Sequence, residues 1–248
     1  MLQLGCQFEW VEQSAVAQAE GQYRRVQFTY LGEGEETPKR FTADVLTFAP
    51  GAVRAELLDQ PDLQQYETVP EAAQKRGAIA AVNGGYYGEE FEPIGLYILN
   101  GQSLQPMSNA SGLLSGVVNI DATGQVNLET RANFSSSRAV SALQSGPFLV
   151  DPGNVLGIYS DNNKLRKRSV VALSEQRELI ILTTSPVSLY TLAQCLHTQA
   201  AGVGVVSIER ALNLDGGIST GMFALLSNQA LAKTEEVAVR TILMFYAE

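Results

Sequence analysis

The sequence predicts an α+β fold with a strand-rich mixed sheet core and few helices. Short runs of alternating apolar and polar residues recur along the chain, separated by turn signals rich in Gly, Pro and Asn. Only one long segment, residues 189–201, repeats its apolar residues with the period of a helix. Because strands and helices do not alternate regularly, a βαβ architecture is not expected.

The amino-terminal part of the chain predicts strands around a surface loop. We expect residues 1–40 to form a strand or extension packed on a main domain of residues 41–248. Tyr23–Leu31 and Arg40–Phe48 alternate like strands. The charged segment Glu33–Lys39 between them contains Gly and Pro and predicts a hairpin loop.

Hydrophobic periodicity and the positions of proline, glycine and capping residues predict the remaining elements. A proline before Glu71–Arg76 and a glycine directly after it predict a short helix. Ser188 is expected to cap the helix Leu189–Ala201, and Gly202 to end it. Asn100-Gly101 predicts a hairpin turn. Further strands are expected at residues 53–58, 78–82, 95–99, 116–120, 126–128, 169–173, 179–184, 211–215, 222–226 and 237–246.

Composition limits the classes of partner. The 248 residues are 45% hydrophobic and 17% charged, which suffices for a sizeable core in one large domain or two small ones. The net charge of -9 argues against nucleic acid or an anionic membrane surface as the main partner, because both bind extended basic faces. No apolar run approaches the ~20 residues that span a bilayer. An anionic ligand therefore requires a local cluster of cations or backbone amides.

Cysteine and histidine are too few for the common transition-metal sites. Cys6 and Cys195 are too far apart in sequence for a C-x-x-C motif, and His197 is the one histidine. We expect no cofactor. If a metal binds, oxygen ligands must dominate, which points to calcium or magnesium.

The segment Ala-Leu-Asn-Leu-Asp-Gly-Gly is the first candidate site motif. Strand alternation places Asn213 and Asp215 on one face and Leu212 and Leu214 on the other. The amides of Gly216–Gly217 could form a concave anion-binding nest beside the carboxylate. A tight Asp-Gly hairpin turn explains the same residues, so both interpretations stay open.

A second segment, Ala81–Tyr87, repeats this arrangement. A short apolar strand ends at Asn83 and is followed by Gly84, Gly85 and two tyrosines that could stack on a sugar ring. A hairpin turn followed by core tyrosines is the alternative. Two strand-end motifs of this kind in one chain favour a shared site.

Arg168 ends the one dense basic patch of this acidic chain, after Lys164, Arg166 and Lys167. A phosphate ligand would need such a partner, because the planar guanidinium matches its oxygens. A solvated loop before a strand explains the patch equally well.

The G-x-S-x-G pattern around Ser219 matches the nucleophile elbow of α/β hydrolases, whose histidine follows the serine. No histidine follows Ser219, and His197 precedes it on a predicted amphipathic helix. We therefore set a serine hydrolase aside.

Several segments follow one another along the chain in a characteristic order: Ala81–Tyr87, Pro93–Leu96, Ser145–Pro147, Arg168–Leu173, the helix at 189–201 and Leu212–Ser219. Their order and spacing together resemble the phosphodiester glycosidase family, related to the enzyme that uncovers mannose 6-phosphate on lysosomal proteins. The resemblance spans roughly residues 40–246, nearly the whole chain. Two positions depart from the usual pattern: Gly88 follows the paired tyrosines, and Ile218 replaces a third glycine.

The resemblance implies a phosphodiester glycosidase-like fold and a hydrolase that removes the sugar from a sugar-1-phosphodiester of the N-acetylglucosamine type, leaving the phosphate on the other partner. Bacterial members of the family are mostly exported. Residues 1–16 show no secretory signal, although a removed signal would look the same. We expect a periplasmic, extracellular or cell-envelope location, with a cytoplasmic one as the alternative.

For this activity we expect Asp215 to supply the carboxylate, with Arg168 and the amides of Gly216 and Gly217 stabilising the phosphate. Asn83 and Asn213 would hold sugar hydroxyls or orient Asp215. A second carboxylate could be Glu209, Glu89 or Glu92, and the sequence does not choose among them. The expected substrate-binding residues are Gly84, Gly85, Tyr86, Ser145, Gly146, Gly216, Gly217, Ser219 and Thr220.

Two other functions fit the same residues. A glycosidase acting on a cell-wall or exported polysaccharide would hydrolyse neutral sugars and no phosphodiesters. A catalytically silent sugar- or phosphate-binding module would bind without turnover. The expected partner is in each case a glycan, and the oligomeric state stays undetermined.

Overall fold

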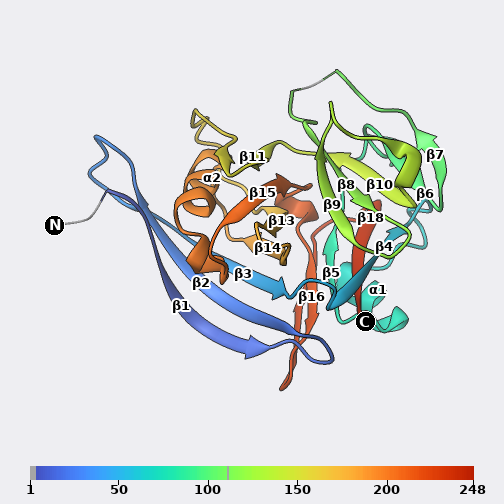
Figure 1. The fold of residues 1–248 in the computed structure, drawn as a ribbon, viewed down its shortest axis with the longest axis horizontal. Helices are drawn as coiled ribbons and strands as arrows, with labels where there is room; N and C mark the ends of the chain where they lie inside the picture. Colours follow the sequence, from blue (N-terminus) through green and yellow to red (C-terminus); the bar gives the residue numbers. More distant parts are fainter. Residues whose placement is uncertain (1–3, 111) are drawn as a thin grey trace.

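A computed structural model of the chain describes residues 4–110 and 112–248 and contains three β-sheets (Figure 1). The strand-rich α+β fold is confirmed. Every strand pair in these residues is antiparallel, so the predicted mixture of strand directions is wrong. The physical reason is that no helical crossover joins parallel neighbours.

The sheets are built from strands that are distant in sequence. The eight-stranded sheet has the order β1 (Gly5–Ala15), β2 (Gly21–Leu31), β3 (Lys39–Phe48), β14 (Leu179–Thr184), β13 (Ser169–Ser174), β15 (Ile208–Asn213), β11 (Phe148–Asp151) and β12 (Val155–Leu156). The second sheet has the order β7 (Gln102–Gln105), β6 (Tyr97–Leu99), β10 (Ser141–Ser145), β8 (Gly116–Ile120) and β9 (Val126–Thr130). The third has the order β17 (Ala230–Lys233), β16 (Met222–Leu225), β5 (Ala80–Asn83), β18 (Thr241–Ala247) and β4 (Val53–Asp59).

In the part of the chain that the structure describes, two α-helices cover these sheets, together with the 3-10 turns η1 (Ser136–Arg138), η2 (Ala200–Val203) and η3 (Gly217–Ser219). Helix α1 (Val69–Arg76) starts two residues earlier than predicted, because Thr68 and Glu71 form a capping box. Helix α2 (Leu189–Thr198) is capped by Ser188, as predicted. It ends three residues earlier than expected, because Gly202 lies in η2 rather than at the helix end.

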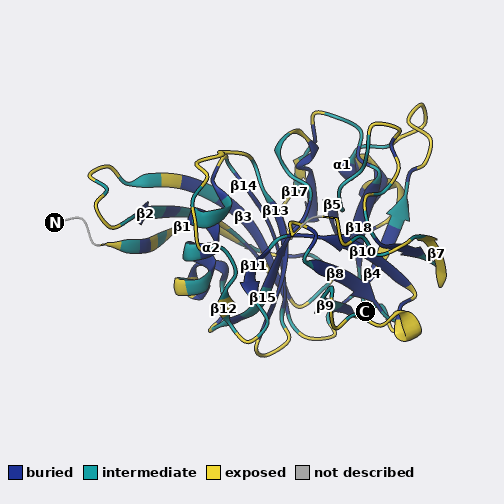
Figure 2. Cartoon of the chain, turned by 90° about the horizontal axis from the view of Figure 1, so that it is seen from above, coloured by how far each residue is buried: buried dark blue, intermediate teal, exposed yellow. Residues whose placement is uncertain are grey.

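The core of the molecule lies where the three sheets meet. Leu46 of β3, Val118 of β8 and Phe245 of β18 are fully buried in one apolar cluster. A second cluster fills the space between the eight-stranded sheet and α2. Figure 2 shows that buried residues form the central strands and exposed ones the loops at the rim.

The first forty residues contribute the edge strand β1 and its neighbour β2 to the eight-stranded sheet. Strand β1 lies where the sequence is weakly patterned, and residues 1–3 of the expected extension lie outside the described residues. A disulfide between Cys6 and Cys195 joins β1 to α2, a pairing that sequence spacing did not suggest. Figure 1 shows the long β1–β2 hairpin beside α2.

Candidate active site

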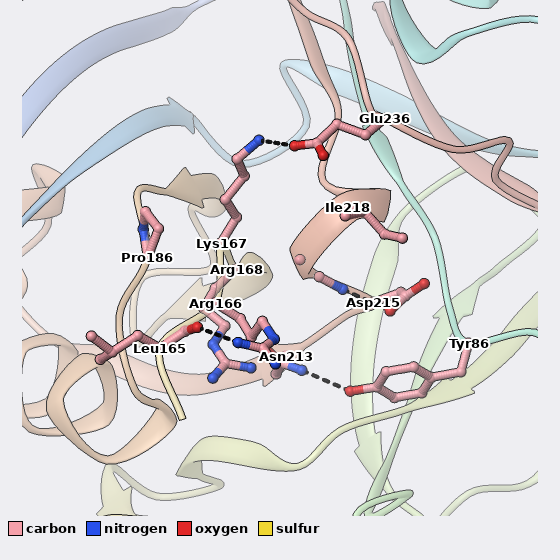
Figure 3. Close-up of a pocket in the computed structure, with 12 residues that line it drawn as sticks. Tyr86, Leu165, Arg166, Lys167, Arg168, Pro186, Asn213, Asp215, Ile218 and Glu236 are labelled. Carbon is pink, nitrogen blue, oxygen red and sulfur yellow. Dashed lines mark hydrogen bonds and ion pairs between the residues drawn. The ribbon is translucent and has the colours of Figure 1, made fainter. Parts of the chain in front are cut away.

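A cavity of about 510 Å³ lies at the seam between the eight-stranded sheet and the third sheet (Figure 3). The ends of β15 and β5 and the start of β13 meet beside it, since Asn213 pairs with Val170 and the Asp215 amide donates to the Gly84 carbonyl (3.1 Å). Its lining residues are Tyr86, Leu165, Arg166, Lys167, Arg168, Pro186, Asn213, Asp215, Gly216, Gly217, Ile218 and Glu236.

The predicted alternation around Asp215 is present. Leu212 and Leu214 are fully buried in the core between the sheets, whereas Asn213 and Asp215 line the cavity. Strand β15 ends at Asn213, two residues before the predicted end, but the chain stays extended enough to keep both polar side chains on one side.

Burial raises the pKa of Asp215, whereas hydrogen bonds from Ser219 and from the Gly216 amide lower it. The Gly216 N–H donates to Oδ1 over 2.8 Å. The net direction is upward, because the two donors compensate only part of the lost hydration of the carboxylate. A raised pKa of this origin, in a carboxylate that lines a cavity, is a property typical of functional sites.

Asn83 supports the site from behind rather than lining it. Its side chain is fully buried, and Nδ2 donates to the Asp215 carbonyl over 2.8 Å. Its Oδ1 accepts from the Ser169 hydroxyl (2.6 Å) and the Gly221 amide (3.2 Å). The two strand-end motifs, Asn83–Gly85 and Asn213–Gly217, thus meet, with Asn83 fixing the backbone that carries Asp215.

Several predicted substrate-binding residues have the same supporting position. A Cβ at Gly84 would lie 2.1 Å from the Thr241 hydroxyl, so a side chain does not fit between β5 and β18. The buried Ser145 hydroxyl donates to the Asn213 carbonyl (2.9 Å). Gly85, Ser145, Gly146, Ser219 and Thr220 do not line the cavity.

Tyr86 forms one wall through a chain of hydrogen bonds. Its hydroxyl donates to the Gly146 carbonyl over 2.6 Å and accepts from Asn213 Nδ2 over 2.9 Å. Burial, reinforced by the charge of Asp215, raises the pKa of Tyr86 to about 12. Tyr86 is therefore a neutral hydrogen-bonding group at physiological pH.

The glycine amides do not form the predicted anion nest. The Gly216 amide bonds the Asp215 carboxylate, and the Gly217 amide donates to the Lys167 carbonyl over 2.8 Å. Gly217 has φ of 66°, which permits this tight turn. Both N–H groups therefore already have acceptors within the chain, although Gly216 and Gly217 line the cavity as predicted substrate-binding residues would.

Cationic side chains supply the positive charge instead. Arg166, Lys167 and Arg168 line one side of the cavity, with Tyr86 and Asp215 on the other (Figure 3). Arg168 is held by the carbonyls of Val187 (Nε, 3.0 Å) and Lys164 (Nη2, 2.8 Å). Burial lowers the pKa of Arg168, but an arginine remains charged at any physiological pH.

None of the carboxylates proposed as partners of Asp215 lines this cavity. Glu209 pairs with Arg210, and Glu89 and Glu92 are exposed in the loop after β5. The structure places Glu236 there instead, ion-paired with Lys167 over 2.7 Å. No sequence pattern marks Glu236, because it reaches the site only through the packing of the segment after β17.

Two other expectations concern His197 and metals. His197 Nε2 lies 3.2 Å from the Asn154 carbonyl, and the residue is not part of the cavity lining. Ser219 contacts Tyr87 rather than a histidine, with 3.4 Å between the hydroxyls. Within residues 4–110 and 112–248, no group of three His, Cys, Asp or Glu side chains could hold a metal ion.

Comparisons with known proteins concern the family and the fold of the chain. The family model described as phosphodiester glycosidase matches residues 76–246. An uncharacterized Escherichia coli (strain K12) protein, YigE, is 30% identical over 146 residues, covering 56% of this chain and 56% of its own length. The match thus spans about half the length of that curated relative.

Solved structures share the fold at low identity. The catalytic domain of zebrafish N-acetylglucosamine-1-phosphodiester alpha-N-acetylglucosaminidase, auto-inhibited by its pro-peptide, has a TM-score of 0.67 and 15% identity, covering 99% of this chain and 89% of that one. A Synechocystis protein has a TM-score of 0.59 and 13% identity over 92% and 62% of the two chains. A Burkholderia pseudomallei protein has a TM-score of 0.60 and 12% identity over 99% and 98%.

Proposed function

The chain belongs to the phosphodiester glycosidase family, and we propose that it hydrolyses the glycosidic bond of a sugar-1-phosphodiester, leaving the phosphate on the other partner. An N-acetylglucosamine-1-phosphodiester is the substrate type named for the zebrafish enzyme of the same fold. We propose a substrate of the same type for this chain.

One observation carries the proposal: the half-buried carboxylate of Asp215 faces three cationic side chains across a cavity of about 510 Å³. Cleaving a glycosidic bond requires a carboxylate that attacks the sugar or activates water, and stabilisation of the leaving group. A phosphodiester leaving group carries its own negative charge, so cations can replace the second carboxylic acid of an ordinary glycosidase. A neutral sugar would bring no negative charge to these cations.

The roles of the residues follow from their positions. Asp215, in its ionised form, attacks the anomeric carbon or takes a proton from water. Arg168, oriented by two backbone carbonyls, receives the phosphate oxygens. Tyr86 and Asn213 contact the sugar. Lys167 exchanges its bond with Glu236 for one with phosphate when the substrate enters.

The test is hydrolysis of a panel of sugar-1-phosphodiesters by the parent and by Asp215→Asn. The parent should release free sugar, and the variant should lose at least a hundredfold in kcat, the scale of a missing acid-base group. Because burial opposes the charge of Asp215, the variant should be at least as stable as the parent at pH 7, so inactivity would not reflect unfolding.

Glu90→Gln is the matched control, since this carboxylate is exposed and lies outside the cavity. It should retain parental rates. An active, folded Asp215→Asn would remove Asp215 from the mechanism. Turnover of neutral glycosides alone would identify a polysaccharide glycosidase, and saturable binding without turnover a silent binding module.

An exported location is the second part of the proposal. The Cys6–Cys195 disulfide is of a kind that persists in oxidising compartments. The structurally similar protein from Burkholderia pseudomallei is provisionally named an exported protein. In the described part of the chain, no helix has both the length and the apolarity to cross a bilayer. Cell fractionation with a thiol-labelling assay would test this, since a cytoplasmic protein would be recovered reduced.

A further inference from the structure

The loop between β17 and β18 carries two adjacent glutamates with different surroundings. Glu236 is exposed and lines the candidate catalytic cavity, where it pairs with Lys167 (Figure 3). Glu235 is only 7% exposed and does not line that cavity. Both oxygens of its carboxylate accept from the Val69 amide, over 3.0 and 3.2 Å. Glu235 therefore attaches residues 235–238 (the anchored segment) to the first residue of helix α1.

The buried carboxylate of Glu235 has no compensating cation. No ion pair joins it to a lysine, arginine or histidine in residues 4–110 and 112–248. Burial raises its pKa, and the negative charge of Glu71 in the first turn of α1 raises it further, against hydrogen bonds from backbone amides. A buried, unpaired carboxylate lowers stability compared with apolar packing. Its presence is therefore better explained by what it holds in place than by stability.

Gly221 provides the space for this carboxylate. A Cβ at Gly221 would lie 2.4 Å from Glu235 Oε2 and 2.9 Å from Val69 Cγ2. The Gly221 amide also donates to Asn83, which in turn holds the Asp215 carbonyl. The attachment of the anchored segment thus lies directly behind the backbone of the candidate site.

The anchored segment contacts the turn η3 by two routes. The Glu236 amide donates to the Ile218 carbonyl over 2.7 Å. The Ala238 carbonyl accepts from the Tyr87 hydroxyl over 2.8 Å, and the same hydroxyl lies 3.4 Å from the Ser219 hydroxyl. Because Ile218 and Ser219 both belong to η3, the position of this turn depends on where the anchored segment lies.

We propose that Glu235 is a positioning residue, which fixes the anchored segment on α1 and thereby keeps Ser219 in place to donate to Asp215. Its effect on catalysis rests on the proposed hydrolysis, whereas the positioning itself depends only on contacts within the chain. The Ser219 bond favours the ionised carboxylate of Asp215. Loss of the Glu235 attachment should therefore make Asp215 harder to ionise.

The direct measurement is the pKa of the Asp215 carboxyl in the full chain, by carboxyl-carbon NMR, with Asp215→Asn to assign the signal. In Glu235→Ala this pKa should rise, by up to about one pH unit if the Ser219 bond is lost completely. Removing a negative charge alone would lower it, so the direction separates positioning from charge. In a Ser219→Ala background, Glu235→Ala should add no further rise, because the bond is already absent.

Two conservative variants and a matched control define the role of the attachment. Glu235→Gln keeps an acceptor for the Val69 amide and should not raise the pKa of Asp215. Glu235→Asp keeps the charge on a shorter side chain and should raise it, which also provides the test if Glu235→Ala does not fold. Glu71→Ala removes the other carboxylate at the start of α1, which accepts from the Thr68 amide over 2.9 Å, and should leave the pKa of Asp215 unchanged.

The proposal is overturned by an Asp215 pKa that does not rise in Glu235→Ala and Glu235→Asp, or by an undiminished further rise in the Ser219→Ala background. An equal rise in Glu71→Ala or in Glu235→Gln would overturn it too. Hydrolysis is followed separately, and the rate of Glu235→Ala should fall at a higher pH than that of the parent. If the pKa shifts as expected but the parent hydrolyses no phosphodiester, the proposed function fails and the positioning role stands.

Discussion

At the scale of single residues, the chemistry of the candidate site depends on how Asp215 is hydrated and bonded. The carboxylate is largely removed from water and receives hydrogen bonds from Ser219 and the Gly216 amide. Burial favours the neutral form of Asp215, and the two hydrogen-bond donors favour its charged form. Each donor therefore lowers the pH at which Asp215 ionises. A residue behind the cavity can thus control the reaction without touching the substrate.

Ser219→Ala should shift the acidic limb of the pH profile of kcat/KM to higher pH. Burial already raises the pKa of Asp215 above the usual value of ~3.9. The proposed hydrolysis requires the ionised form of Asp215, so the rate should fall as pH decreases through the raised pKa. Removing the Ser219 donor raises this pKa further, by about one unit if the bond contributes about 1.4 kcal/mol.

The measurement is kcat/KM between pH 4 and 8 on one phosphodiester substrate. Ser227→Ala, an exposed serine outside the cavity lining, is the control and should leave the limb in place. If the acidic limb of the kcat/KM profile of Ser219→Ala lies at the same pH as in the parent, or at a lower pH, Ser219 does not stabilise the ionised carboxylate.

At the scale of elements, the candidate site is made where strands end. Strands β5 and β15 belong to different sheets, and the bond from the Asp215 amide to the Gly84 carbonyl joins them directly beyond their ends. Turns at strand ends expose polar side chains that would be paired or buried inside the sheet. The repeated strand-end motif predicted this meeting, and the buried Asn83 shows how it is fixed.

Strand β1 is an element whose attachment can be tested. It is an edge strand, and besides its pairing with β2 it is held by the Cys6–Cys195 disulfide. Cys6→Ser/Cys195→Ser should lower the free energy of unfolding by roughly 3–5 kcal/mol, because the crosslink closes a very long loop in the unfolded chain. Urea denaturation measures this loss.

The single tryptophan of the chain reports on β1 specifically. Trp10 Nε1 donates to the Gly202 carbonyl over 3.1 Å, and the Arg24 guanidinium lies over its ring. In the double variant, Trp10 fluorescence should shift to the red at lower urea than the far-UV circular dichroism changes. Coincident transitions would show that β1 detaches only when the whole molecule unfolds. Reductant should lower the stability of the parent, which contains the disulfide, and should leave the stability of the variant unchanged.

At the scale of the whole molecule, the three sheets are held together by a shared apolar cluster and by a buried ionic contact. Asp44 of β3 is 1% exposed, accepts from the Tyr23 hydroxyl over 2.6 Å and pairs with Lys233 of β17. This contact links the eight-stranded sheet to the third sheet. Apolar packing and an ion pair thus both hold the eight-stranded sheet and the third sheet together, and the candidate active site lies between these two sheets.

Lys233→Met should destabilise the protein by about 3 kcal/mol, because it leaves a buried carboxylate without its cation. Lys75→Met removes an exposed lysine that pairs with Glu67, and should change stability by less than about 1 kcal/mol. Thermal unfolding at one pH compares the two. Similar losses in both variants would mean that the Asp44–Lys233 pair behaves as a surface ion pair.

The limits of prediction are visible in particular residues. Alternation in a strand depends only on local geometry, so the sequence predicts that Leu212 and Leu214 share one face, and the structure shows that this face is buried in the core. Helix α2 began at its predicted cap for the same reason, but its end at Thr198 was not predicted, because Gln199 and η2 are set by packing against the sheet. Strand β1 has no clear pattern, because an edge strand is mostly exposed on both faces.

The sequence by itself determined the strand-rich fold, the family resemblance and the polar pair Asn213 and Asp215, because these depend on neighbouring residues and their order. Only the tertiary structure decided that Glu236 rather than Glu209 enters the cavity, that the glycine amides are occupied, and that Cys6 meets Cys195. These are contacts between segments far apart in the chain. They follow from the packing of whole sheets, which no local pattern encodes.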